Sequence, residues 1–147
     1  MFAEQMLPRA RERLATVSAG APVREAADLM SKPHTDLVVV CDQDGSMVGV
    51  LTKTDIVGQI RHCAGNGCTA SVDAIMTRDV VSCRPAELLE DIWSAMKARG
   101  LQRIPVVDQN SKPIGIIYAR DALQNLLGEV ENQESLLRDY VMGVGYR

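Results

Sequence analysis

The 147-residue sequence has few aromatic residues, no basic tract and no long apolar run. Aromatic residues make up 3% of the chain, which leaves little material for a platform that stacks on single-stranded nucleic acid. The formal net charge of −3 does not favour a nucleic acid or an anionic membrane as partner. No apolar run approaches the roughly 18 residues that a membrane-spanning helix needs.

The four cysteines are too few to define a disulfide scaffold in a chain of this length, and the chain lacks the pattern of a secretory signal. Glu4 stands where a signal would carry a basic segment followed by an apolar one. We therefore expect reduced thiols and a cytoplasmic location. Cys63 and Cys68, close to His62, leave open a redox or metal-binding site, although an ordinary flexible linker is the favoured interpretation of this Gly-bearing stretch.

What the sequence does contain is one long pattern that occurs twice, at an offset of 66 residues. Gly49 falls on Gly115, Asp55 falls on Asp121, and Val40-Cys41-Asp42 falls on Val106-Val107-Asp108. Upstream the register slips by two, so that Val17-Ser18 matches Val81-Ser82. The two copies extend over about residues 16–60 and 80–126.

Each copy is expected to form a strand, a helix, two strands and a second helix. In the first copy the strands are predicted at 16–18, 37–41 and 47–51, and the short β-branched run at 37–41 is typical of a buried strand. A helix follows Pro22 and stops at Lys32-Pro33. In the second copy the later two strands are predicted at 101–107 and 114–117, and an amphipathic helix is predicted over 121–142.

Two stretches of the second copy, Gly100-Leu101-Gln102-Arg103-Ile104-Pro105-Val106-Val107-Asp108 and Gly115-Ile116-Ile117-Tyr118-Ala119-Arg120-Asp121, resemble the cystathionine-β-synthase (CBS) domain. Two such domains in tandem resemble a stand-alone Bateman module. The resemblance implies an α/β fold, in which two β-α-β-β-α repeats pack across their sheets with pseudo-two-fold symmetry, followed by a C-terminal helix. The expected units are 1–66, 67–127 and 128–147. The resemblance further implies a homodimer that binds an adenosyl ligand between the repeats.

Within this resemblance, the segment Gly49-Val50-Leu51-Thr52-Lys53-Thr54-Asp55 matches a pattern that holds ribose and phosphate. Thr52 and Lys53 would contact phosphate at a helix N-terminus, and Asp55 would accept hydrogen bonds from the ribose hydroxyls. A capping box, in which Thr52 and Asp55 close the start of the helix, is the alternative.

The second copy departs from this pattern, because Tyr118 stands where the first has Thr52. Asp121 would serve ribose and Arg120 would face phosphate. Tyr118 would either stack on a base or block the cleft.

The base is expected to lie against backbone groups of short apolar strands, although the side chains of these strands belong mainly to the core. The expected cleft walls are Thr16, Val17, Val38, Val39, Val40, Val81, Cys83, Ile104, Pro105 and Val106.

The leading hypothesis is a regulatory module, not an enzyme, that needs no cofactor and responds to an adenine nucleotide or S-adenosylmethionine. It would signal to an unknown regulated protein. The alternatives are a redox or metal sensor working through Cys63 and Cys68, and a structural adaptor without ligand. The residues from Gly128 to Arg147 either contact a second copy or a partner, or fold back on their own domain.

Overall fold

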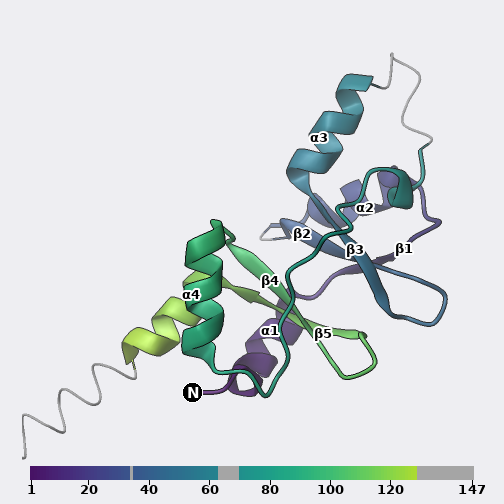
Figure 1. Ribbon diagram of the computed structural model, residues 1–147. Helices are drawn as coiled ribbons and strands as arrows, with labels where there is room; N and C mark the ends of the chain where they lie inside the picture. Colours follow the sequence, from purple (N-terminus) through teal and green to yellow (C-terminus); the bar gives the residue numbers. More distant parts are fainter. Residues whose placement is uncertain (34, 63–69, 129–147) are drawn as a thin grey trace, which may run out of the picture.

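The structure, a computed structural model, describes residues 1–33, 35–62 and 70–128, and it contains the two expected α/β repeats (Figure 1). The first repeat consists of β1 (Thr16–Ser18), α2 (Val23–Met30), β2 (Leu37–Cys41), β3 (Met47–Thr52) and α3 (Lys53–His62). The second consists of α4 (Leu89–Arg99), β4 (Arg103–Val107), β5 (Pro113–Tyr118) and a helix that begins at residue 119. η1 (Ala3–Met6) and α1 (Leu7–Arg13) precede the first repeat, and η2 (Val72–Ala74) lies between the two repeats.

The first sheet has the order β1-β2-β3, with β1 parallel and β3 antiparallel to β2. In the second sheet β4 and β5 are antiparallel, and the expected first strand is reduced to a single parallel bridge from Cys83 to Val106. Pro85 follows closely and has no N–H to extend this pairing.

The pairing also corrects the expected register slip. Val17 lies opposite Val40, and Cys83 lies opposite Val106, so that the offset of 66 residues holds through the first strand. The match of Val17-Ser18 to Val81-Ser82 was wrong, because backbone pairing and not residue identity sets the register.

The two sheets pack on each other through apolar side chains. Leu37 and Val39 of β2 and Val50 of β3 form one buried cluster with Ile116 and Tyr118 of β5. The alternate residues of β2 face the other way, toward the core beneath α2 and α3. Because β2 is buried on both faces, its sequence is apolar without interruption.

The segment that precedes the first repeat packs on the second repeat. α1 lies beside β5 (Figure 1), and Ala3, Met6 and Ala10 belong to the same core as Leu89 of α4. The approach is close at Gly115, where a Cβ atom would lie 2.7 Å from the Cβ of Ala10. A division of the chain after residue 66 therefore separates α1 from the core that it helps to build.

The segment that precedes the second repeat crosses the first in the same way. Thr77 and Val50 exchange backbone hydrogen bonds of 2.8 and 2.9 Å. A Cβ atom at Gly49 would lie 2.7 Å from the Sδ of Met76. Met76 stands 66 residues after Ala10, and Gly49 stands 66 residues before Gly115, so that both crossings use equivalent positions. Each repeat is thus covered by the segment that leads into the other.

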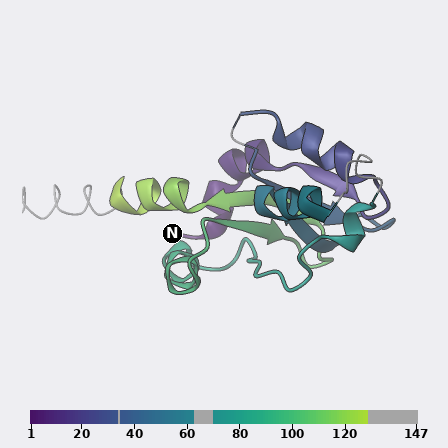
Figure 2. The ribbon, with the colours of Figure 1, turned by 90° about the horizontal axis from the view of Figure 1, so that it is seen from above.

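The helix predicted over 121–142 begins two residues earlier, at 119, and continues directly from β5 (Figure 2). The structure describes it to residue 128, and the rest of the predicted helix lies outside the described residues. Within the described parts of the chain, no helix has the length and apolar character needed to cross a bilayer.

Candidate functional site

A hollow lies where the ends of the two repeats meet, and it has two adjoining lobes with volumes of about 520 and 460 Å³. Asp36 and the residues from Gly100 to Arg103 line both lobes. Each volume falls within the range of small-molecule sites, which is roughly 300–1,000 Å³. We call this space the central hollow; its other lining residues are Leu37, Thr52, Lys53, Thr54, Trp93, Met96, Lys97, Tyr118, Ala119 and Arg120.

The central hollow is built from equivalent positions of the two repeats. Residues 36–37 correspond to 102–103 at the offset of 66, and residues 52–54 correspond to 118–120. All of these residues line the hollow. α4 adds a further wall through Trp93, Met96 and Lys97, and Gly100 and Leu101, which follow this helix, also line the hollow. A molecule bound here would contact both repeats together.

Charged groups meet in the wall that the two lobes share. The Nζ of Lys53 lies 2.9 Å from one carboxylate oxygen of Asp36, and the other oxygen accepts a hydrogen bond from Arg103. The hydrogen bond from Lys53, together with the positive charges of Lys53 and Arg103, holds the pKa of Asp36 below its ordinary value. Asp36 and Arg103 belong to different repeats, so their ion pair links the two.

Tyr118 stands between two guanidinium groups. The Cζ of Arg103 lies 4.9 Å from the ring centroid of Tyr118, and that of Arg13 lies 4.3 Å from it. These distances are typical of cation–π contacts. The ring is largely buried, although Tyr118 contributes to the wall of the hollow. The two alternatives for Tyr118, stacking on a base and blocking a cleft, stay predictions.

The hollow brings together four of the residues that the sequence assigned to ligand, namely Thr52, Lys53, Tyr118 and Arg120. Asp55 does not line it. The backbone N–H and the hydroxyl of Thr52 donate to Asp55 Oδ2 over 3.0 and 3.2 Å, and the Asp55 N–H lies 3.3 Å from Thr52 Oγ1. This is the capping box that the sequence left open. The Asp55 carboxylate also faces Thr77, at 3.4 Å.

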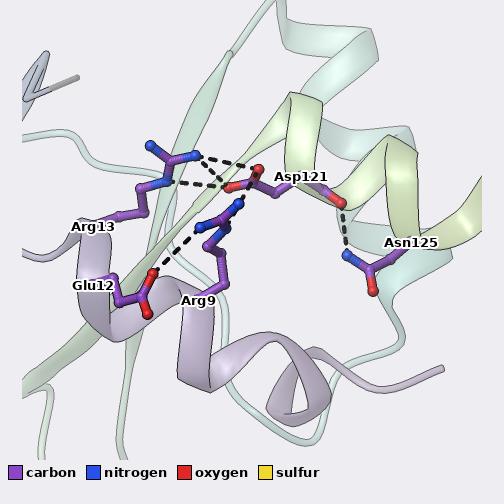
Figure 3. Close-up of polar contacts among 5 residues, drawn as sticks. All are labelled: Arg9, Glu12, Arg13, Asp121 and Asn125. Carbon is purple, nitrogen blue, oxygen red and sulfur yellow. Dashed lines mark hydrogen bonds and ion pairs between the residues drawn. The ribbon is translucent and has the colours of Figure 1, made fainter. Parts of the chain in front are cut away.

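Asp121 also lies away from the lining of the hollow, on the side of α1 (Figure 3). Arg13 donates to its two carboxylate oxygens from Nε and Nη2, over 3.2 and 3.3 Å. Arg9 approaches the same carboxylate at 4.0 Å. Asp121 is only 4% exposed. The carboxylate expected to hold ribose is therefore part of a buried ion pair that fastens α1, and its role as a ribose ligand stays a prediction.

The expected cleft walls lie mostly in the core. Val17, Cys83, Ile104, Pro105 and Val106 are buried, as are the three valines at 38–40. Thr16 is exposed and Val81 is half-buried. None of these residues lines the central hollow. Their contact with a base through backbone groups stays a prediction.

Sequence reasoning missed several residues of the hollow: Asp36, Trp93, Lys97, Gln102 and Arg103. The repeat offset contained a signal for some of them. Asp36 and Gln102 are equivalent, and both stand just before a buried strand of the pattern. Charged or polar residues at equivalent positions beside the motif would have pointed to this site.

The cysteine alternative depends on Cys63 and Cys68, which lie outside the described residues. Burial raises the pKa of the Cys41 thiol, and burial, with the charge of Glu87, raises that of Cys83 to about 12. Neither thiol is therefore suited to redox chemistry near neutral pH. Among the described residues, no group of His, Cys, Asp and Glu side chains is placed to hold a metal ion.

Comparison with known proteins agrees with this architecture. The family model of the CBS domain matches residues 7–62 and 72–128. CBS domain-containing protein YhcV of Bacillus subtilis is 34% identical over 113 residues, which are 77% of this chain and 79% of YhcV. Homoserine O-acetyltransferase of Methanohalobium evestigatum is 29% identical over 110 residues, which are 75% of this chain but 22% of the enzyme. This chain thus spans about a fifth of the length of such enzymes.

Solved structures share the fold over most of the chain. The CBS-domain protein ATU1752 from Agrobacterium tumefaciens has a TM-score of 0.70 and 26% identity, and the match covers 85% of this chain and 98% of that one. CBSX2, solved in complex with AMP, has a TM-score of 0.72 and 22% identity, over 86% and 96% of the two chains. The CBS pair of MJ0100, solved with 5-methylthioadenosine and S-adenosyl-L-methionine, has a TM-score of 0.70 and 22% identity, over 88% and 97%. The chain therefore belongs to the CBS-domain family and carries two CBS domains in tandem.

Proposed function

We propose that this chain is a regulatory module, not an enzyme, which binds an adenosyl ligand in the central hollow. The observation that carries the proposal is the construction of the hollow from equivalent segments of both repeats. A ligand in contact with both halves can shift the way they pack, provided that it binds one arrangement better than the other. The binding of AMP by CBSX2 and of S-adenosyl-L-methionine by the MJ0100 pair supports an adenosyl ligand.

The chain carries its own reporter for this binding. Trp93 is its single tryptophan and lines the hollow. Titration of the full chain with AMP, adenosine and S-adenosylmethionine should change the Trp93 fluorescence in a saturable way, with calorimetry on the same samples. If none of the three binds, the proposed function is refuted.

A variant that fills the hollow tests the location of the site. Gln102 is exposed and lines both lobes, so Gln102→Phe should weaken ligand binding at least about tenfold, the equivalent of about 1.4 kcal/mol. Gln43 is an exposed glutamine in the turn between β2 and β3, away from the hollow, and Gln43→Phe is the matched control. Equal binding by both variants would place the ligand elsewhere.

We further propose that the module forms a homodimer through the helices that follow each motif. Val57 and Ile60 on α3 are both 62% exposed, and Leu123 and Leu127 on the helix from 119 are also exposed. Val57 and Leu123 occupy equivalent positions of the two repeats. Apolar residues exposed in this repeated pattern favour a protein contact. Sedimentation of Val57→Lys should give a monomer where the unaltered chain gives a dimer.

A further inference from the structure

We propose that Asp36 is an internal competitor of the ligand: a phosphate group on a ligand in the central hollow would displace the Asp36 carboxylate from Lys53 and Arg103. The inference rests on the proposed function, because it concerns the ligand of the same hollow. It selects an adenine nucleotide over a neutral nucleoside or a sulfonium compound.

The lining of the hollow carries an excess of positive charge. Four cationic side chains line the hollow, those of Lys53, Lys97, Arg103 and Arg120. Among the described lining residues Asp36 is the single acid. A concave site with an excess of one charge concentrates ligands of the opposite charge. The lining therefore favours an anionic group and disfavours the sulfonium and ammonium groups of S-adenosylmethionine.

Asp36 does not satisfy all the hydrogen-bond donors of these cations. Asp36 binds Lys53 with one carboxylate oxygen and Arg103 with the other. The Nε of Arg103 is nevertheless buried and has no hydrogen-bond partner within the described part of the chain. A buried donor without an acceptor is costly. A phosphate offers more acceptor oxygens than a carboxylate, so it can satisfy Lys53 and more of the guanidinium donors together.

The ion pair between Lys53 and Asp36 is also accessible to a ligand. The side chain of Lys53 is 57% exposed and that of Asp36 is 29% exposed, so the ion pair lies at the mouth of the hollow and not in the core. Lys53 is also the first residue of α3, where the helix N-terminus favours an anion. A phosphate can therefore reach these cations without unfolding either repeat.

This competition supplies a route from ligand to regulation. The pair between Asp36 and Arg103 joins the first repeat to the second. A phosphate that takes Arg103 from Asp36 removes this link and replaces it with contacts through the ligand. The packing of the repeats then depends on whether the ligand is bound.

The test compares AMP with adenosine, which differ by the phosphate alone, through Trp93 fluorescence and calorimetry of the full chain. At low ionic strength AMP should bind at least about tenfold more tightly, and the difference should shrink with added salt. Asp36→Asn should tighten the binding of AMP several-fold and leave that of adenosine unchanged. Lys53→Gln should weaken AMP binding. Lys112→Gln, in the turn between β4 and β5 and outside the lining, is the matched control.

The outcomes separate the two proposals. If AMP and adenosine bind equally, the hollow is still an adenosyl site but the phosphate inference is refuted. If Asp36→Asn weakens AMP as Lys53→Gln does, Asp36 is not a competitor. If no adenosyl compound binds, both proposals fall. If circular dichroism shows that Asp36→Asn is unfolded, Lys53→Gln and the salt dependence decide. If neither the Lys53→Gln substitution nor added salt changes the affinity for AMP, the inference is refuted.

Discussion

Removal of the Asp121 carboxylate should destabilise the fold, and should do so by releasing α1. In Asp121→Ala the guanidinium of Arg13 loses both of its hydrogen bonds to the carboxylate while its side chain stays 13% exposed. Breaking a buried ion pair by removal of one partner costs about 3–5 kcal/mol. The contact of Arg13 with Tyr118 remains, and the guanidinium can turn partly toward water. We therefore expect a loss of about 3 kcal/mol.

Urea denaturation followed by circular dichroism measures this loss, as a lower midpoint with an unchanged m-value. Arg9→Ala is the control, because Arg9 is 58% exposed, lies 4.0 Å from Asp121 and also pairs with Glu12; it should cost less than about 1 kcal/mol. The double variant Arg13→Ala with Asp121→Ala should show a coupling energy of about 2 kcal/mol. A loss below about 1 kcal/mol for Asp121→Ala, combined with loss of AMP binding, would refute the structural role and restore Asp121 as a ribose ligand.

Gly115→Ala should lower the stability of the fold by about 1–3 kcal/mol, because its Cβ would press against Ala10. Gly58→Ala is the control: a Cβ there would have no atom within 4 Å, so this variant should raise the stability by up to about 1 kcal/mol. Thermal melts of the two variants compare these effects. Cys83, with a pKa near 12, should resist iodoacetamide at pH 8 until the chain is unfolded, as peptide mass spectrometry can show. In the folded chain the pKa of Asp36 lies below its ordinary value of 3.8. The carboxylate therefore stabilises the fold above pH 3.8, and this contribution is lost as the pH falls through the pKa of the folded state. The difference in stability between the unaltered chain and Asp36→Asn should be under about 1 kcal/mol at neutral pH and should vanish in acid.

Much of the fold could be predicted from the sequence because local patterns encode it. The ranges 16–18 and 37–41 were predicted as strands with the bounds that β1 and β2 have. The repeat offset located the equivalent hairpins. The structure adds an irregularity in register that was not predicted, after Val40 in one hairpin and after Val106 in the other. Each of these features depends on residues that are close in sequence or related by duplication.

The parts that could not be predicted depend on contacts between distant segments. Nothing local indicates that α1 crosses to the second repeat, because its apolar residues would suit either core. Arg13 and Asp121 are 108 residues apart, and their pairing appears only once that crossing is known. The sequence therefore placed the motif on the correct strands and helices but could not tell which of its side chains would face the hollow.

The different fates of Asp55 and Asp121 can nevertheless be traced to two substitutions between the repeats. Thr52 supplies the hydroxyl that closes the capping box on Asp55, and its equivalent is Tyr118, whose side chain does not take that place. Arg13 pairs with Asp121. The position equivalent to Arg13 in the other crossing segment holds Asp79, and an acid cannot form such an ion pair with Asp55. The carboxylate of Asp55 thus caps its own helix, whereas the carboxylate of Asp121 binds the segment that crosses the second repeat. Since both carboxylates are engaged away from the central hollow, the cations around Asp36 are the groups best placed to hold a ligand there.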